Sequence, residues 1–530
     1  MTTPIADTTT ANGAPSYSTT LDPRLDLFIK TTRNVCDVCD VCDVCVGVEA
    51  NANTNTALYA MIDKSWLVDP LDTMKILMNW RDCRGGKGDY HGFIVAMTYI
   101  DKTYNEWFIA NFKIIPEYGS WLDLVKLWHF CTNESKQAIM DYIVVKLEED
   151  LTNLDNDDET TQKSVSLLAK WIPSENSKWD RYGSNSNSNS SSNRFIITLC
   201  KNLICDNDAA RILGRHIKLL RKQYLTPLRA HLAIVESKMC AKQFDNINYE
   251  TVPSVAMKKY RNAFMRNDKE GFSQYMQQVK SGEKKINASQ VYPHDLVRHY
   301  LNQLGAGGAF DPVIEEQWAS IKKTVKETGS FDKSICVCDV SGSMHGTPME
   351  VAIALGLLGL YNDQVITFSD NPQLHKVTEE TLQDQVSNMV KMEWGMSTNF
   401  EKTMDLVLNL CLNASAVDDH IKRVFIFSDM QFNVAIGDRN NDNTTLFQTL
   451  RAKFAKSEIK MPQIIFWNLS GQTNDFPVTT DENGVVMFSG YSPSLLTALV
   501  DGDDVSPMTM LLKVIRGSRY DKVCEIAHGR

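Results

Sequence analysis

No apolar run in this sequence is long enough to cross a membrane. The longest, Val351 to Tyr361, falls far short of the roughly 18 to 20 residues that a membrane-spanning helix needs. The first 30 residues are rich in Thr and lack the basic start and apolar run of a secretion signal. These absences predict a cytoplasmic protein that does not associate with membranes. A nuclear location stays open.

The chain also lacks a general excess of positive charge, since its net charge is −10. This argues against a uniformly basic nucleic-acid-binding protein, although it leaves room for a local basic patch. No Gly-x-x-x-x-Gly-Lys-Ser/Thr loop is present, because the segment Arg84-Gly-Gly-Lys-Gly88 has neither that spacing nor the hydroxyl. The sequence therefore does not predict a nucleotide-triphosphate enzyme.

Cysteine is plentiful, at 13 residues, but its distribution does not indicate disulfides. Four of the cysteines form the three-residue repeat from Cys36 to Cys45, and Cys336 and Cys338 lie in an apolar segment. Buried free cysteines of this kind are typical of a reducing compartment. The repeat has the Cys-x-x-Cys spacing of zinc ligands, yet simple sequence expansion also produces it, and both interpretations stay open.

The length of 530 residues exceeds the roughly 250 to 300 at which a single core stops growing, so several domains are expected. Residues 1–54 are rich in Thr and Asn and predict a disordered, low-complexity tail. Residues 55–330 show helical apolar spacing and predict an α-helical repeat domain, with a flexible Ser/Asn insert at 184–193. A different pattern begins at residue 331.

Residues 331–530 alternate short apolar strands with helices, which predicts a mostly parallel sheet with helices on both faces. The expected strands are Ser334 to Asp339, Gln364 to Ser369, Val424 to Asp429 and Gln463 to Leu469. The expected helices are Pro348 to Tyr361, Asn399 to Leu412 and Thr445 to Lys456. The whole chain is thus predicted to be multidomain, with a Rossmann-like α/β domain after the helical one. Sheets of this kind bind ligands beyond the carboxyl ends of their strands.

One carboxylate and several hydroxyls lie at those expected strand ends. Asp339 closes an apolar strand and is followed at once by Ser341 and Ser343, while Asp429 closes a later strand. Thr398 lies between them in the segment Gly-Met-Ser-Thr-Asn, just ahead of a helix. A set of one or two acids with hydroxyls suits Mg²⁺, a hard cation that prefers oxygen ligands and keeps some waters.

This pattern resembles the metal-ion-dependent adhesion site of von Willebrand A domains. The resemblance implies that Asp339, Ser341, Ser343, Thr398 and Asp429 hold Mg²⁺, directly or through water, and that the ion accepts a carboxylate from a partner protein. A phosphatase is the minor alternative, because a strand-end Asp can serve phosphoryl transfer. It is disfavoured here, since a second acid is expected two residues after the first, where this chain has Ser341.

The helical half contains a strongly basic segment. Residues 201–290 hold 17 Lys plus Arg against eight Asp plus Glu, a net charge of +9 in a chain that is acidic as a whole. Arg215, Lys218 and Lys222 fall on one side of an expected helix. A basic face of this kind would attract phosphates and bind RNA in a salt-dependent way, while the alternative is a merely solvated helix face.

Several stretches of the helical half resemble a family of uncharacterised plant, fungal and giant-virus proteins. They are DTMKILMNWRDCRGGKGD from Asp72, IPEYGSWLDLVKL from Ile115, AKWIPSENS from Ala169 and VPSVAMKKYRNAF from Val252. That family is in turn similar to the Ro ribonucleoprotein autoantigen, in which a ring of HEAT-like helical repeats, the TROVE domain, precedes a von Willebrand A domain. Ro-type proteins bind small RNAs through the basic surface of the ring.

The resemblance implies RNA binding by the helical half, and phosphate contacts are expected from its basic residues: Arg84, Lys87, Arg215, Lys218, Lys222, Lys258, Lys259 and Arg261. The conspicuous aromatic and charged residues of the motifs are expected to serve packing instead: Trp80, Arg81, Asp82, Tyr118, Trp121, Trp171 and Tyr260. The sequence thus predicts a non-enzymatic binding protein that binds RNA and, through a metal, an acidic residue of a protein. A protein-only scaffold is the alternative.

Overall fold

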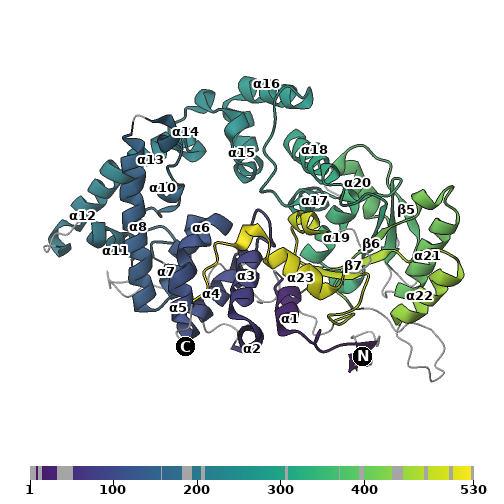
Figure 1. Ribbon diagram of the computed structural model, residues 1–530. Coiled ribbons are helices and arrows are strands. Elements are labelled where there is room, and N and C mark those ends of the chain that lie inside the picture. The colour runs from purple at the N-terminus through teal and green to yellow at the C-terminus, as the bar shows by residue number, and fades with distance from the viewer. Residues whose placement is uncertain are drawn as a thin grey trace.

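The computed structural model describes residues 7–9, 15–32, 52–156, 158–181, 194–203, 209–304, 308–368, 371–392, 399–431, 446–470, 476–499 and 505–526. Two features singled out above, the cysteine repeat at 36–45 and the insert at 184–193, lie outside these residues. The described chain consists of a helical region followed by an α/β domain (Figure 1).

The helical region runs from α2 to α18. Its helices are α2 (Ala52–Val68), α3 (Pro70–Arg81), α4 (His91–Thr103), α5 (Asn105–Asn111), α6 (Ile115–Tyr118), α7 (Trp121–Phe130), α8 (Asn133–Leu154), α9 (Glu159–Gln162), α10 (Leu168–Trp171), α11 (Phe195–Leu203), α12 (Ala209–Leu219), the π-helical turn η3 (Leu220–Leu225), α13 (Thr226–His231), α14 (Val235–Cys240), α15 (Ser254–Asn267), α16 (Lys269–Lys280), α17 (Pro293–Leu301) and α18 (Pro312–Glu327). Among the described residues, no helix is long and apolar enough to span a bilayer.

Local sequence explains where these helices begin and end. In α3 the Asp69 side chain accepts a hydrogen bond from the Asp72 backbone N–H at 2.9 Å, and Pro70 occupies the first helical position. Both features are favoured at helix starts, because the first backbone N–H groups have no partner within the helix. Several other helices, such as α8 with Thr132 and α18 with Asp311, begin with a side-chain cap of the same kind.

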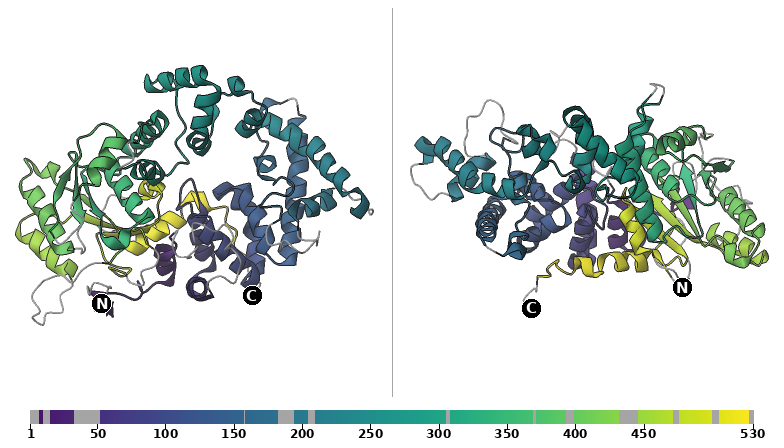
Figure 2. Two further views of the ribbon diagram at one scale, coloured as in Figure 1. Left: turned by 180° about the vertical axis from the view of Figure 1, so that it is seen from behind. Right: turned by 90° about the horizontal axis from the view of Figure 1, so that it is seen from above.

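The helices follow an arc in space. In Figure 1 the chain rises from α2–α8 through α13 and α14 to α15 and α16 at the top of the view. Helices α17 and α18 then lie between α16 and the α/β domain, and the left view of Figure 2 shows the same arrangement from behind. The buried apolar side chains form two clusters. The larger one runs through α1–α13 and into the α/β domain, while a smaller one, which includes Val252, Phe264 and Phe272, holds α14–α16 together.

The α/β domain contains a six-stranded sheet with the order β5-β4-β3-β6-β7-β8, in which only β5 is antiparallel to its neighbour. The strands are β3 (Ser334–Asp339), β4 (Gln364–Phe368), β5 (Leu374–Lys376), β6 (Arg423–Ser428), β7 (Gln463–Asn468) and β8 (Val485–Ser489). The four predicted strands are confirmed to within a residue at each end, while β5 and β8 were not predicted. The chain winds outward from β3 in one direction to β4 and then in the other direction from β6.

Helices cover both faces of this sheet. Helix α19 (Thr347–Leu358) lies on the face that carries Cys336 and Cys338, where Gly356 and Gly359 allow the helix to approach the two thiols. On the opposite face, Phe466 of β7 packs against Phe400 of α21 (Phe400–Leu412) and Phe447 of α22 (Leu446–Lys456). The remaining helices are α20 (Leu382–Met389) and α23 (Pro507–Ile515).

The predicted disorder of residues 1–54 is wrong for part of that segment. Helix α1 (Pro23–Lys30) is capped by Asp22 and buries Leu25, Leu27 and Phe28 completely. It contacts α2 and α3 of the helical region as well as β8 and α23 of the α/β domain. The short apolar stretch is ordered because both domains supply it with a surface to pack against, which the polar composition around it concealed.

Helix α17 provides a second junction between the two parts of the chain. It packs along α19, and the Arg298 guanidinium donates to Glu350 Oε2 at 2.7 Å and to Thr347 Oγ1 at 2.9 Å. Both acceptors belong to the first turn of α19. Both ends of the helical part of the chain therefore contact the α/β domain: α1–α3 at the start and α17 near the end.

Candidate metal centre and the basic residues

The candidate metal centre lies where the winding direction of the sheet reverses. Strands β3 and β6 are adjacent and parallel, and Asp339 ends the first while Asp429 directly follows the second. At such a point the loops after the two strands diverge to opposite faces and leave a crevice, which is where open α/β sheets bind ligands. The two acids therefore occur at the edge that sequence analysis indicated.

Asp339 is completely buried, and its carboxylate accepts two hydrogen bonds, one from the loop that follows it and one from β6. Its Oδ1 accepts the Ser341 backbone N–H at 2.9 Å, and its Oδ2 accepts the Ser428 hydroxyl at 2.6 Å. The Ser341 and Ser343 hydroxyls lie 3.1 Å apart, and the Ser343 side chain is exposed. Ser428, which sequence analysis missed, fixes the carboxylate of the neighbouring strand.

Asp429 supplies a second buried acid, with 4% of its surface exposed. Its Oδ1 accepts the Gln431 backbone N–H at 3.1 Å, and Met430 between them has a φ of 68°, so the chain turns sharply after β6. Burial, and next the charge of Asp429, raise the pKa of Asp339 from 3.8 to about 6. Among the described residues neither acid forms a salt bridge.

These residues fit a hard divalent cation. Two buried carboxylates of like charge are unfavourable unless a positive group neutralises them, and a cation with two acids and two hydroxyls nearby would do so. Within the described ranges no group of three or more His, Cys, Asp or Glu side chains could hold a metal, so a site here depends on the hydroxyl ligands. Thr398, the fifth predicted ligand, lies outside the described residues.

The predicted RNA-contacting residues divide into three groups. Arg215, Lys218 and Lys222 are exposed along α12 and η3, and none of the three forms an ion pair with a described residue. All three are therefore exposed, Arg215 and Lys218 on α12 and Lys222 in the π-helical turn that follows it.

The second group, on α15, is largely occupied by partners within the protein. Arg261 pairs with Asp311 at 2.5 Å, and Lys258 Nζ donates to the Asp295 carbonyl at 3.0 Å. Burial lowers the pKa of the Lys258 ammonium group. Lys259 is exposed and forms no ion pair with a described residue, and its ammonium group lies 5.2 Å from the centre of the Tyr260 ring.

The third group, on the loop at residues 82–89, requires a correction. Lys87 is only 3% exposed, and its ammonium group donates to the carbonyls of Phe28 and Thr31 and to the hydroxyls of Thr31 and Ser489. Burial lowers its pKa well below the usual value. Lys87 therefore cannot contact a phosphate at the surface. Arg84 is exposed and donates to the Glu117 carbonyl at 2.8 Å.

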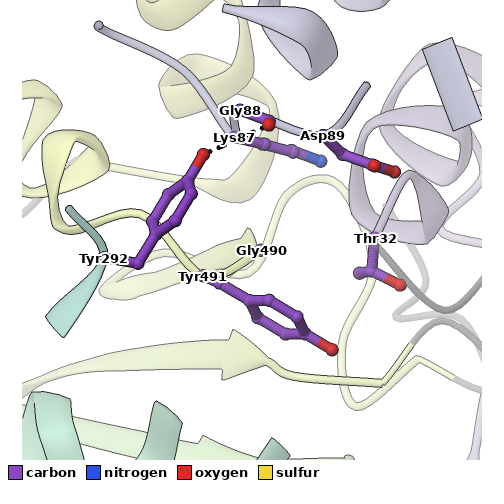
Figure 3. Close-up of a pocket in the computed structure, with 7 residues that line it drawn as sticks. All are labelled: Thr32, Lys87, Gly88, Asp89, Tyr292, Gly490 and Tyr491. Atoms are coloured by element: carbon purple, nitrogen blue, oxygen red, sulfur yellow. Dashed lines mark hydrogen bonds between the residues drawn. The ribbon is translucent and has the colours of Figure 1, made fainter. Parts of the chain in front are cut away.

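Lys87 lies instead at the junction of the two parts of the chain. Figure 3 shows Lys87, Gly88 and Asp89 of the helical region beside Gly490 and Tyr491 of the α/β domain, with Thr32 and Tyr292 next to them. The Tyr292 hydroxyl donates to the Gly88 carbonyl at 3.1 Å, and Gly88 has a φ of 73° that favours glycine. The motif RGGKG thus serves domain contact.

Three of the aromatic motif residues that were predicted to serve packing are buried in the helical region. Trp80 is fully buried, Tyr118 is 2% exposed and Trp121 is 9% exposed. Arg81 pairs with Asp123 at 2.7 Å in the same core.

The fold and the site together define a class of two-part proteins, in which a helical arc precedes a mostly parallel α/β domain with paired acids at its strand ends. Residues 10–144 and 136–331 match a domain of unknown function, DUF2828, and residues 333–519 match a second domain of unknown function, DUF7788. The chain is 32% identical to an uncharacterized protein of Acanthamoeba polyphaga mimivirus, over 96% of this chain and 86% of the viral protein. The chain therefore belongs to the DUF2828 family.

Proposed function

We propose that the α/β domain is a von Willebrand A-type domain that binds Mg²⁺ and, through the ion, a carboxylate of a partner protein. The observation that carries the proposal is the burial of Asp339 and Asp429 at the ends of two adjacent parallel strands, without a basic partner among the described residues. Asp339, Ser341, Ser343 and Asp429 would hold the ion, together with Thr398. The bound ion would supply a positive charge that a partner carboxylate can ligate.

The proposal assigns no catalytic role to these residues. The surrounding loops offer hydroxyls and two acids, a set that suits Mg²⁺, whereas Zn²⁺ sites use His or Cys. A phosphatase would need a general acid positioned near the leaving group. His345 is exposed and Ser341 occupies the position where a second acid is expected, so partner binding is favoured over turnover.

Isothermal titration calorimetry with MgCl₂ tests the metal site. The wild type should give binding heats, and Asp339→Asn should give none, because it removes a ligand charge while keeping the shape of the side chain. Asp481→Asn, at an exposed position of the same domain, is the matched control and should bind as the wild type does. Equal heats for wild type and Asp339→Asn would refute the assignment, and phosphomonoester turnover that Asp339→Asn abolishes would favour the phosphatase.

A second function, RNA binding by the helical region, is favoured by one observation. Arg215, Lys218 and Lys222 are exposed together in the segment with the +9 charge. Cations that have no acidic neighbour remain available to phosphates, and their binding releases counterions. We propose that this α12–η3 surface contacts the RNA backbone without reading its sequence.

Filter binding with structured and single-stranded RNAs at several salt concentrations tests this proposal. Reversing Arg215, Lys218 and Lys222 to Glu should weaken binding of all RNAs alike and reduce the slope of log K against log salt by about 2, since each phosphate contact contributes roughly 0.7. The control reverses Lys322, Lys323 and Lys326, which are exposed on α18. Equal RNA affinity in both triple variants would refute this surface, and salt-insensitive binding of proteins alone would favour a scaffold.

A further inference from the structure

The C-terminal segment leaves the α/β domain and returns to the helical region. After α23, residues 516–524, which we call the strap, cross α3 and run toward α5 (Figure 1). The strap includes the turn η9 (Ser518–Tyr520). It contacts residues of α3, the loop 82–89 and α5–α6, more than 400 positions away in the sequence, and we call this set of contacting residues the groove.

Asp82 forms the centre of the groove and binds two strap residues. Its carboxylate accepts two hydrogen bonds from the Arg519 guanidinium, one of them at 2.6 Å, and one from the Tyr520 hydroxyl at 3.0 Å. Asn79 donates to the same Tyr520 hydroxyl at 2.9 Å. The Tyr520 ring stacks on that of Tyr118 with 5.4 Å between centroids. Arginine and tyrosine are thus recognised by shape as well as charge.

A second acid of the groove binds the beginning of the strap. Arg516 donates to both oxygens of Asp72, at 3.1 and 2.7 Å, and Asp72 also pairs with Arg24 of α1 at 2.9 Å. Lys522, further along the strap, pairs with Glu117 at 2.6 Å. Three basic residues of the strap therefore each meet an acid of the helical region.

The groove also binds the strap backbone. The Asn111 amide accepts the Cys524 N–H at 2.8 Å and donates to the Cys524 carbonyl at 3.1 Å. The Tyr118 hydroxyl donates to the Arg519 carbonyl at 2.9 Å. Such contacts hold the backbone of the strap in register whatever its side chains are, while the acids select basic residues at fixed positions.

The burial of the charged side chains on the two sides is unequal, although Tyr520 of the strap is itself only 2% exposed. The Asp82 and Asp72 side chains are 0% and 3% exposed, whereas those of Arg519 and Arg516 are 40% and 50% exposed. The acids are embedded in the helical region, and the arginines reach them from its surface. A buried carboxylate needs a cationic partner. Asp72 keeps Arg24 of α1 when the strap leaves, whereas Asp82 has Arg519 as its one ion-pair partner among the described residues, so Asp82 requires a basic ligand whether or not that ligand is the strap.

We propose that this groove is a recognition site for a basic peptide of the pattern Arg-x-x-Arg-Tyr-x-Lys, and that the strap occupies it as a displaceable intramolecular ligand. The site is distinct from the metal centre and from the α12–η3 surface, and the inference does not rest on the proposed function. Release of the strap frees the groove for a peptide with the same spacing of charges. It also removes one of the contacts that join the α/β domain to the helical region.

A fluorescence-anisotropy titration tests the proposal. The probe is a fluorescein-labelled peptide of residues 514–526 with Cys524→Ser. It is titrated with the full-length wild type and with the double variant Arg516→Ala/Arg519→Ala, in which the strap binds the groove more weakly. The peptide should bind the double variant at least tenfold more tightly than the wild type, because the strap no longer competes. Adding Asp82→Asn to the double variant should abolish binding, and a peptide with both arginines changed to Ala should not bind.

Hydrogen exchange on the unmodified protein provides the second measurement. The amides of the strap should exchange at least tenfold faster than those of α3 and β8, because a displaceable ligand opens without global unfolding. Circular dichroism checks that the variants are folded, and exchange decides the matter if they are not. Strap amides that exchange only as fast as those of α3 would overturn the proposal, as would equal peptide affinity in the wild type and the folded double variant.

Discussion

Replacing Asp339 by Asn should stabilise the metal-free protein while removing its response to Mg²⁺. Because the pKa of Asp339 is raised from 3.8 to about 6 in the folded state, its carboxylate ionises in the unfolded chain before it does in the folded one. Between pH 3.8 and about pH 6 the folded state binds more protons than the unfolded state does. The free energy of unfolding therefore falls as pH rises through this window, and it stays lower above it. The difference between a pKa of 3.8 and one of about 6 corresponds to about 3 kcal/mol.

The variant side chain has nearly the same shape and carries no charge. At pH 7.5 in EDTA, Asp339→Asn should therefore be more stable than the wild type by about 1 to 3 kcal/mol, the lower end allowing for altered hydrogen bonds with Ser341 and Ser428. With Mg²⁺ at about 100 times its Kd, the wild type should gain about 2.7 kcal/mol and the variant nothing. This difference in EDTA should shrink as pH falls below 6 and nearly vanish below about pH 3, because Asp339 is then protonated in both the folded and the unfolded state.

Urea denaturation followed by tryptophan fluorescence measures these differences. It should be run at pH 4, 5, 6 and 7.5, with EDTA and with Mg²⁺, and Asp481→Asn serves as the control for loss of an exposed charge. If Asp339→Asn is less stable than the wild type by more than 1 kcal/mol in EDTA at pH 7.5, the carboxylate is already satisfied by the protein. The argument for a cation at this site would then fail.

Two further substitutions test the junction around residues 82–89. Lys87→Met should cost about 2 to 4 kcal/mol in urea denaturation, because it leaves buried oxygens without a donor. Since the folded-state pKa of Lys87 is lowered, the wild type should gain stability relative to this variant as pH rises toward 9. Gly86→Ala should cost about 1 to 3 kcal/mol, because its Cβ would overlap the Asn79 carbonyl, and an unchanged midpoint would contradict that.

The α/β domain could be predicted from sequence because its signals are local. Each strand is a continuous apolar segment, and the carboxyl ends of parallel strands meet at one edge of a sheet, so Asp339 and Asp429 could be placed there without knowledge of the structure. Ser428 carries no comparable signal. Its hydrogen bond to Asp339 depends on the register of β3 against β6, which the sequence of neither strand specifies by itself.

The junction residues could not be predicted for the opposite reason. Lys87 and Arg84 occur in a loop rich in glycine and positive charge, a composition shared by phosphate-binding loops and by loops that approach other backbones closely. Only the contacts of this loop with the α1 segment and with the strap distinguish these two cases. Both segments are remote from the loop in the sequence. Likewise, the charge count could not show that Lys258 and Arg261 are paired with acids, while Lys218 forms no ion pair with any residue that the structure describes.

The strap also sets an order for folding during synthesis. Helix α3 emerges from the ribosome long before residues 516–524, so Asp82 must wait without Arg519 while the entire α/β domain is translated, and Asp72 has only Arg24 of α1 as its arginine partner during that time. Domains synthesised first normally fold as units of their own. Here the last contacts to form are made by the last-translated described segment, and a ribosome stalled within the α/β domain would leave the helical region with its acidic groove open.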